Sequence, residues 1–600
     1  MSTVPAIRAR RRGLLAAALV VCGITASAVV TLTATPAAAA DESISVNFAV
    51  AGGSPTYRAS GWIYGMTENG SNPPSNFFTD VKFRYMRAGG AQLSSPGGWV
   101  AGTYDRRWNS TLAQARRTAA LGGQFIMLVH DIWGADGFPI DRFPGDNGNW
   151  TDYDNYLTRL INDVRAAGIT VQWDLWNEPN LSLFWNRPAS QYLEMIRRGT
   201  QRVRAAFPSH LIVGPSYAGV PSTNSWWATY LDYVKANNVI PDIFSWHSLP
   251  GDPVANVAVA NSILSARNIA HPRPYQINEY GASNEQNPGD GAWYIARLER
   301  AGADGLRANW ASGGNLHNDL ASLLVRNSAG VYQPKGEWWV YRFYAQQTGL
   351  ISSVTPSPAY DAFATKDNGN AKILIGGGGT TGNLAVNIQG LNTTSGIVQN
   401  NQLRVVVNRI PFNNGGAVSG PMQHSNTVVT LSNNGTTVNL PHSDINETFT
   451  IELRPPGATS GSWERVTSRH SGLVMDVSGI STADGALVHQ WQWLSGTNQQ
   501  WQFQDAGGGY FRVVARHSGK CLDVSNASTV DGADVLQWTC NNGMNQQWQW
   551  VAANGGFFTL RPRHSGKCLD VFNFSTVNGG RLVQWTCTGG VNQQWSRAIV

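Results

Sequence analysis

The chain has 600 residues and is poor in charge, since charged residues make up 14% and the formal net charge is +6 at neutral pH. A typical soluble domain has about 25% charged residues. Four arginines lie in the first 40 residues, and without that segment the charge falls to +2. The basic balance therefore does not indicate a nucleic-acid partner. The abundant Gly, Asn, Thr and Trp favour neutral, hydroxyl-rich ligands, and the length predicts two to four domains.

The first 40 residues have the order of an export signal. Basic residues at 8–12 precede an apolar run at 13–30, and four alanines at 37–40 follow. A basic head, an apolar middle and a small-residue exit are typical of a secretory signal peptide. We therefore predict a signal peptide at 1–40 and a secreted, extracellular protein that has no membrane segment after cleavage. The alternative is that the apolar run remains as a membrane anchor.

From residue 41 to residue 349, short apolar runs alternate with amphipathic helices. Apolar residues between 157 and 164 follow helical spacing, for example, and Gly168 stops that helix. Eight strand-and-helix units are typical of a (β/α)8, or TIM, barrel, although the first strands alternatively join the domain that follows. The expected strands are 63–66, 83–87, 125–130, 170–175, 211–215, 242–247, 274–279 and 305–310.

Two carboxylates stand where expected strands end. Glu178 follows the fourth strand in Trp-Asn-Glu-Pro, and Glu279 ends the seventh. Catalytic groups of a TIM barrel gather at the C-terminal ends of the strands, so these side chains should face one another across its mouth. Two carboxylates can hydrolyse a glycoside, because one protonates the leaving oxygen and the other attacks or stabilises the anomeric carbon. The alternative for either residue is a solvated surface glutamate.

These motifs resemble the clan A retaining glycoside hydrolases, and with the added domain they are most similar to glycoside hydrolase family 39, over about residues 43–455. The resemblance implies that Glu178 is the acid/base and Glu279 the nucleophile. It implies substrate-binding roles for Asn177, at the sugar 2-hydroxyl, for Arg87 and His247, around the nucleophile, and for Trp310, as an aromatic floor. The alternatives are a structural ion pair for Arg87 and core packing for His247 and Trp310. His130, which ends the third strand, either lines the pocket or packs in the core.

Residues 350–454 contain short β-rich runs that alternate with Gly/Asn turns. This rhythm predicts a small antiparallel β-sandwich. The stretch 455–461 is rich in Pro, Gly and Ser and is predicted to be a linker.

Residues 462–600 contain one unit three times. His470, His517 and His564 are spaced by 47 residues, and each repeat ends in Asn-Gln-Gln-Trp. Three copies with short apolar runs and Gly-rich turns predict three β-subdomains around one core. The four cysteines beyond the predicted signal peptide permit three disulfide connectivities. The periodic Trp residues are most simply core residues.

This repeat resembles the ricin-type β-trefoil lectins with their Q-x-W signature, also classed as carbohydrate-binding module family 13. By the resemblance, sugar hydroxyls are bound by Asp476, Asp523 and Asp570 with Asn498, Asn545 and Asn592. Thirteen residues after each aspartate, where such lectins often place Gln, the chain has His489, Leu536 and Val583. Equal places in repeats two and three favour disulfides within a repeat, Cys521 with Cys540 and Cys568 with Cys587.

The sequence therefore predicts a multidomain protein with a (β/α)8 barrel, a small antiparallel β-sandwich and a β-trefoil. The resemblances imply a secreted retaining glycosidase that acts on plant-type polysaccharides or their side chains, such as arabinofuranosides or xylosides, and that binds its substrate through a lectin module. The alternative is a secreted lectin whose barrel is catalytically silent. No metal-ligand spacing or phosphate-binding loop stands out, so neither a metal nor a cofactor is expected.

Overall fold

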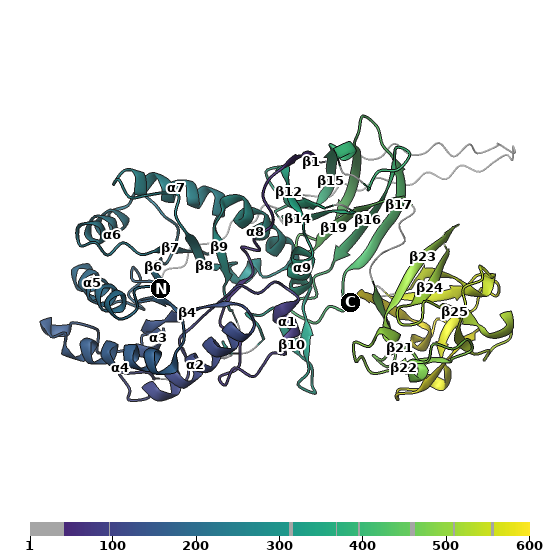
Figure 1. The fold of residues 1–600 in the computed structure, drawn as a ribbon, viewed down its shortest axis with the longest axis horizontal. Helices are drawn as coiled ribbons and strands as arrows, with labels where there is room; N and C mark the ends of the chain where they lie inside the picture. Colours follow the sequence, from purple (N-terminus) through teal and green to yellow (C-terminus); the bar gives the residue numbers. More distant parts are fainter. Residues whose placement is uncertain are drawn as a thin grey trace, which may run out of the picture. The chain divides into compact units, whose positions relative to one another are not determined.

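The computed structural model describes residues 41–600, except for 95, 138, 311–315, 318, 368, 378, 394–395, 457–462, 508–509 and 554–556. The predicted signal peptide at 1–40 and most of the predicted linker lie outside the described residues. The remaining chain forms a closed parallel barrel, a β-sandwich and a trefoil (Figure 1), which confirms the predicted fold class. No helix within the described part of the chain is both long and apolar enough to cross a membrane.

Eight parallel strands close into the barrel, each paired with the next along the chain and β9 paired with β2. All eight lie within or beside the predicted ranges. The strands are buried on both faces because helices cover the outside, and their sequences are accordingly apolar. They are β2 (Gly61–Ile63), β3 (Tyr85–Ala88), β4 (Gln124–Leu128), β5 (Gln172–Asp174), β6 (Ile212–Tyr217), β7 (Ile243–Ser248), β8 (Tyr275–Tyr280) and β9 (Asp304–Arg307).

Helices surround the barrel strands in Figure 1. In α4 the apolar positions at helical spacing are buried, and Gly168 ends the helix in the left-handed conformation, with φ +63°. A hairpin of β10 (Leu324–Arg326) and β11 (Tyr332–Pro334) precedes the last helix. The helices are α1 (Asn76–Thr79), α2 (Tyr104–Ala120), α3 (Val129–Trp133), α4 (Thr151–Ala167), α5 (Ala189–Ala206), α6 (Ser225–Ala236), α7 (Pro253–Ser265), α8 (Pro288–Ala301) and α9 (Gly336–Ala345).

The sandwich contains a strand from the start of the described chain. β1 (Glu42–Ala51) lies between β12 and β15, and its pairing with β15 is parallel, so the sandwich is not purely antiparallel. Its alternate residues Ile44, Val46 and Phe48 are buried in the sandwich core. The other strands are β12 (Leu350–Thr355), β13 (Asp361–Lys366), β14 (Ala371–Gly376), β15 (Gly382–Gln389), β16 (Gln402–Ile410), β17 (Met422–Thr430), β18 (Thr436–His442) and β19 (Thr448–Arg454).

The barrel and the sandwich are in direct contact through α8, which packs on β13 and β14. Arg297 and Arg300 of α8 both pair with the buried Asp361 at the start of β13. The amide of Gly289 also donates to the carbonyl of Asn446 at 3.1 Å. The sandwich is therefore joined to the outer helical layer of the barrel by charged as well as apolar contacts.

The trefoil has an apolar core to which each repeat contributes its last tryptophan. Trp501, Trp548 and Trp595 are fully buried, and each indole N–H donates to a backbone carbonyl of its own repeat. The predicted disulfides, Cys521 with Cys540 and Cys568 with Cys587, are confirmed. The strands are β20 (Glu464–Ser468), β21 (Val474–Val477), β22 (Val488–Trp491), β23 (Trp501–Gly507), β24 (Tyr510–Ala515), β25 (Cys521–Val524), β26 (Val535–Trp538), β27 (Gln547–Ala552), β28 (Phe558–Pro562), β29 (Cys568–Val571), β30 (Gly580–Trp585) and β31 (Trp595–Ile599).

Candidate active site

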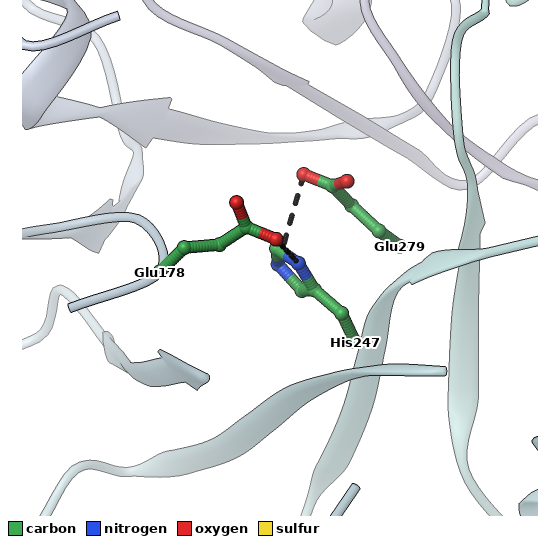
Figure 2. Close-up of side chains that lie close together, drawn as sticks. All are labelled: Glu178, His247 and Glu279. Atoms are coloured by element: carbon green, nitrogen blue, oxygen red, sulfur yellow. Dashed lines mark hydrogen bonds and ion pairs between the residues drawn. The ribbon is translucent and has the colours of Figure 1, made fainter. Parts of the chain in front are cut away.

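Both predicted carboxylates meet one imidazole at the mouth of the barrel. Glu178 follows β5, His247 lies in β7 and Glu279 lies in β8. Nδ1 of His247 is 2.8 Å from Oε1 of Glu178, and its Nε2 is 3.6 Å from Oε1 of Glu279 (Figure 2). An oxygen of each carboxylate and a nitrogen of the imidazole lie within 4.8 Å of one another. The two carboxylates thus face a common space, with the imidazole against both.

Arg87 lies beneath this pair and is fully buried. From β3 its guanidinium donates to Oε1 of Glu279 at 2.9 Å, to Oδ2 of Asp174 at 2.9 Å and to Oδ1 of Asn177 at 2.7 Å. A guanidinium can satisfy three acceptors because its donors form a rigid planar fork. Arg87 is therefore both an ion-pair partner in the barrel interior and a direct contact of Glu279.

The buried network below the carboxylates includes residues that the sequence did not indicate. Oδ2 of Asp174 accepts from the Ser216 hydroxyl at 2.7 Å and from the Asn278 amide at 3.2 Å, in addition to Arg87. The Ser216 hydroxyl lies 3.1 Å from that of Ser245. Asp174 ends β5, so its position at a strand end was the available signal. Asp174 and Ser216 thus belong to the buried hydrogen-bond network that supports the catalytic candidates.

The backbone at Glu178 is strained. Its φ is +46°, and its amide donates at 2.9 Å to the carbonyl of Ser216, whose own φ is +52°. Such left-handed conformations cost a non-glycine residue of order 1–3 kcal/mol and persist where the surroundings enforce them. The hydrogen-bonded pair of left-handed residues turns the Glu178 side chain toward His247.

The two carboxylates differ in their electrostatic surroundings. Burial raises the pKa of Glu279 above its ordinary value, and repulsion from Glu178 adds to this effect, while His247 and Arg87 oppose it. Burial also acts to raise the pKa of Glu178, but the hydrogen bond and charge of His247, with Arg87, lower it below its ordinary value. His247 thus acts to lower the pKa of both carboxylates, and the two carboxylates titrate as a coupled pair.

The remaining barrel residues predicted to bind substrate occupy different places. The oxygen of Asn177 accepts from Arg87, and its amide nitrogen has no hydrogen-bond partner among the described residues. His130 is buried in α3 beyond the end of β4, where its Nε2 is 2.8 Å from Asp131. Trp310 lies three residues beyond the end of β9, and its side chain is 46% exposed. Its indole N–H donates at 2.9 Å to the carbonyl of Gly281, two residues after Glu279.

Glu178, His247 and Glu279 are also a donor set that can hold a divalent cation. The guanidinium of Arg87, however, already donates to the Glu279 oxygen that lies nearest His247. A cation at this point would be repelled by that fixed positive charge. The residues therefore fit a carboxylate pair neutralised by arginine better than a metal centre.

The predicted sugar-binding residues of the trefoil are brought together in each repeat. Asn498, Asn545 and Asn592 donate at 2.9 Å to Oδ2 of Asp476, Asp523 and Asp570, respectively. In repeats two and three the same oxygen also accepts from Gln546 or Gln593 of the Asn-Gln-Gln-Trp motif. In repeat one His489 contacts Oδ1 of Asp476 at 3.0 Å instead. Glutamines of the repeated motif thus supply the second polar contact where position thirteen is apolar.

One set of periodic tryptophans, one in each repeat, does not lie in the core of the trefoil. Trp538 is 43% exposed, and Trp491 and Trp585 are half-buried. Each ends the strand that pairs with the strand of its aspartate. The expectation that these residues belong to the core was wrong for this set, because strand ends at the rim of the trefoil remain accessible. An accessible indole on the strand paired with that of a buried carboxylate suits a sugar ring, which presents an apolar face and hydroxyl edges.

Comparisons with known proteins find one matching family and two similar curated proteins. Residues 445–538, 497–585 and 544–599 match the family described as ricin-type beta-trefoil lectin domain-like. The chain is 26% identical over 262 residues to a 3-O-alpha-D-galactosyl-alpha-L-arabinofuranosidase of Bifidobacterium longum subsp. longum, covering 41% of this chain and 20% of the relative. It is 24% identical over 162 residues to a 3-O-beta-L-arabinopyranosyl-alpha-L-arabinofuranosidase of Bifidobacterium pseudocatenulatum, covering 25% and 16%. The chain thus spans a fifth or less of the length of these curated relatives.

A solved structure shares the fold of the larger part. The protein N2152 from Neocallimastix frontalis is 24% identical, with a TM-score of 0.57, and the match covers 69% of this chain and 99% of that one. This likeness concerns the fold alone. The sequence match, by contrast, concerns the C-terminal repeats, which are similar to the ricin-type beta-trefoil lectin domain-like family over residues 445–599.

Proposed function

We propose that the protein is a secreted retaining glycoside hydrolase that acts on arabinose- or xylose-containing plant glycans. The observation that carries the proposal is the pair Glu178 and Glu279, with oxygens within 4.8 Å, at the C-terminal end of the barrel. Carboxyl groups about 5–5.5 Å apart are typical of retaining glycosidases, whereas inverting enzymes separate them by about 6.5–9.5 Å to admit a water. The short separation favours retention.

In the proposed reaction, Glu178 donates its proton to the glycosidic oxygen while a carboxylate oxygen of Glu279 attacks the anomeric carbon. The bond to the leaving group breaks, the alcohol departs, and a glycosyl ester of Glu279 forms. Glu178, now a carboxylate, then removes a proton from water, whose oxygen attacks the same carbon and releases Glu279. The free amide N–H groups of Asn177 are available to the sugar hydroxyl beside the reacting carbon.

Neutral His247 can arrange the protons that this reaction requires. With its hydrogen on Nε2, the imidazole directs that N–H toward Glu279 and leaves Nδ1 to accept from a protonated Glu178. Arg87 and the Nε2–H group then both favour the charged form of Glu279, while Glu178 retains the proton it must donate. An imidazolium instead favours Glu178 as a carboxylate, which cannot act as an acid. The geometry thus supports a reaction that needs His247 to be neutral.

The substrate class rests on several observations together. The two curated relatives are named for arabinofuranosidase activities, although each is matched over only part of its length. The trefoil repeats match a lectin family, and a linked binding module raises the local concentration of a polymeric substrate.

The two disulfides favour an oxidising, extracellular environment. Mass spectrometry of the protein from the culture medium would test export. Cleavage of the predicted signal peptide should leave a mature chain that begins near Asp41.

The test is hydrolysis of arabinogalactan, arabinoxylan, xylan and aryl glycosides by the mature protein. We expect Glu178→Gln and Glu279→Gln each to lower kcat by about a thousandfold or more on the active polysaccharide. Glu194→Gln, which changes a partly exposed carboxylate on α5, is the matched control and should retain activity. Proton NMR of the first product should show the anomer of the substrate.

Two results would contradict the proposal. An inverted first anomer would exclude the double displacement. A wild-type protein that releases no product but binds one of the polysaccharides would instead support the alternative, a lectin with a silent barrel. Loss of activity in both Gln variants, with retained folding and an active control, would support the assigned pair.

A further inference from the structure

The barrel has a hollow that the carboxylate pair does not line. Its volume is about 1080 Å³, slightly above the usual range of about 300–1,000 Å³ for small-molecule sites. Its walls come from the segment after β2, from α2 and from His317, which lies beyond β9; the lining includes Thr67, Asn69, Asn72, Arg106, Asn109 and His317. These segments follow barrel strands at their C-terminal ends or, in the case of α2, continue the chain beyond β3. The hollow is therefore formed by elements of the catalytic face.

A chain of side-chain contacts runs from the hollow to His130. The ring of His317 packs edge-on against Tyr64, with centroids 5.0 Å apart. The hydroxyl of Tyr64 donates to Asp131, which lies 2.8 Å from Nε2 of His130. His130 is near enough to Glu178 for its charge to lower the pKa of that carboxylate. The hollow thus lies several packed side chains away from the reacting groups, in the same barrel.

The hollow is close to electrically neutral. Its cation Arg106 pairs with Glu68 through two hydrogen bonds of 2.8 and 3.0 Å, so the two charges cancel locally. His317 donates from Nε2 to the carbonyl of Ala91 at 2.8 Å, and its Nδ1 lies 3.3 Å from the amide nitrogen of Gln114. Burial lowers the pKa of His317, which keeps the ring neutral. A phosphate or carboxylate ligand would find no unpaired cation here.

The remaining lining consists mainly of short amide and hydroxyl side chains. The exposed amide of Asn109 has no side-chain hydrogen bond within the described chain and offers both a donor and an acceptor. The walls beside it are firm, because Ser110 is buried and accepts from Gln114, and Asn69 accepts from the amide of Ser71 at 3.1 Å. Fixed polar groups without net charge can form hydrogen bonds with a neutral ligand that is rich in hydroxyl groups.

We propose that this hollow is a carbohydrate-binding subsite for sugar units of the substrate that lie away from the cleaved bond. The inference rests on the proposed glycosidase function. It follows that the hollow contributes to the binding of a polysaccharide and not to the binding of a small aryl glycoside. Its occupant is a neutral oligosaccharide segment because the lining is polar, uncharged overall and formed by elements at the catalytic face of the barrel.

The experiment compares two substrates in the full mature protein. Ala113→Trp fills the hollow from α2, and Asn109→Ala removes the free amide without adding bulk. Ala120→Trp, at an exposed position near the end of the same helix, is the matched control. We expect both hollow variants to raise KM for the cleaved polysaccharide, Ala113→Trp by about tenfold, or about 1.4 kcal/mol. The kcat/KM for the aryl glycoside of the same sugar should stay within about twofold.

The outcomes separate this inference from the function on which it rests. A wild-type enzyme that cleaves neither substrate refutes the glycosidase function and the subsite with it. An active enzyme whose two hollow variants treat both substrates as the wild type does refutes the subsite alone. Equal losses on both substrates also refute it, because a remote subsite cannot change the reaction of a ligand that does not reach it. Circular dichroism of each variant would show that the fold is retained.

Discussion

Removing the buried cation beneath the active site should destabilise the barrel strongly. The side chains of Arg87 and Asp174 are both 0% exposed, and their ion pair measures 2.9 Å. In Arg87→Met the carboxylate of Asp174 retains hydrogen bonds from Ser216 and Asn278 but has no cation. Breaking a buried pair at one side costs about 3–5 kcal/mol because an uncompensated charge remains. We therefore expect Arg87→Met to lower the free energy of unfolding of the barrel by about that amount.

The double variant Arg87→Met/Asp174→Asn tests the reason for the loss. Its second change neutralises the stranded carboxylate, so it should recover part of the stability lost in the single variant. Denaturant unfolding followed by the helical circular dichroism signal suits this measurement, since the α-helices of the described residues all lie between 76 and 345. A single-variant loss below about 1 kcal/mol, or a double variant less stable than the single one, would refute the reasoning.

Three further changes test other parts of the structure. His247→Asn removes a group that lowers the pKa of Glu279, so the acidic limb of the pH profile of kcat/KM, which reports the ionisation of the nucleophile, should move to higher pH; an unmoved acidic limb would contradict the coupling. Burial raises the pKa of Asp290 to about 6 from 3.8, so the folded state binds this proton more tightly and loses stability as pH rises through that interval. Asp290→Asn should therefore stabilise the protein at pH 7, by at most about 3 kcal/mol, and much less at pH 3. A difference in unfolding midpoint between variant and wild type that is the same at both pH values would contradict this. Replacing Cys568 and Cys587 with Ser opens a loop with a sequence separation of 19 and should cost the trefoil about 3 kcal/mol in its own unfolding transition, whereas an unchanged transition would show that the loop is already restrained.

Local patterns were sufficient to predict the architecture. Apolar runs and helical spacing recur eight times because each strand and helix of a barrel must bury its own apolar side, and this periodicity is visible in the sequence. The spacing of 47 residues in the trefoil is likewise a sequence property. Glu178 and Glu279 could be selected because residues at the C-terminal ends of barrel strands converge on one face.

The tertiary structure alone decided how those residues interact. The distance between the carboxylates, the position of His247 against both of them and the anchoring of Arg87 by Asp174 depend on the tilt and register of strands far apart in the chain. Contacts of this kind have no signature in local spacing.

The trefoil shows the same division. Its repeat predicted three aspartate sites, but whether Gln546 or His489 completes a site depends on which side chain the folded loop turns toward the carboxylate. The sequence therefore determined which elements form and which residues reach each rim. Packing between elements determined their distances, charges and exposure, because these quantities arise only when distant segments share one interior.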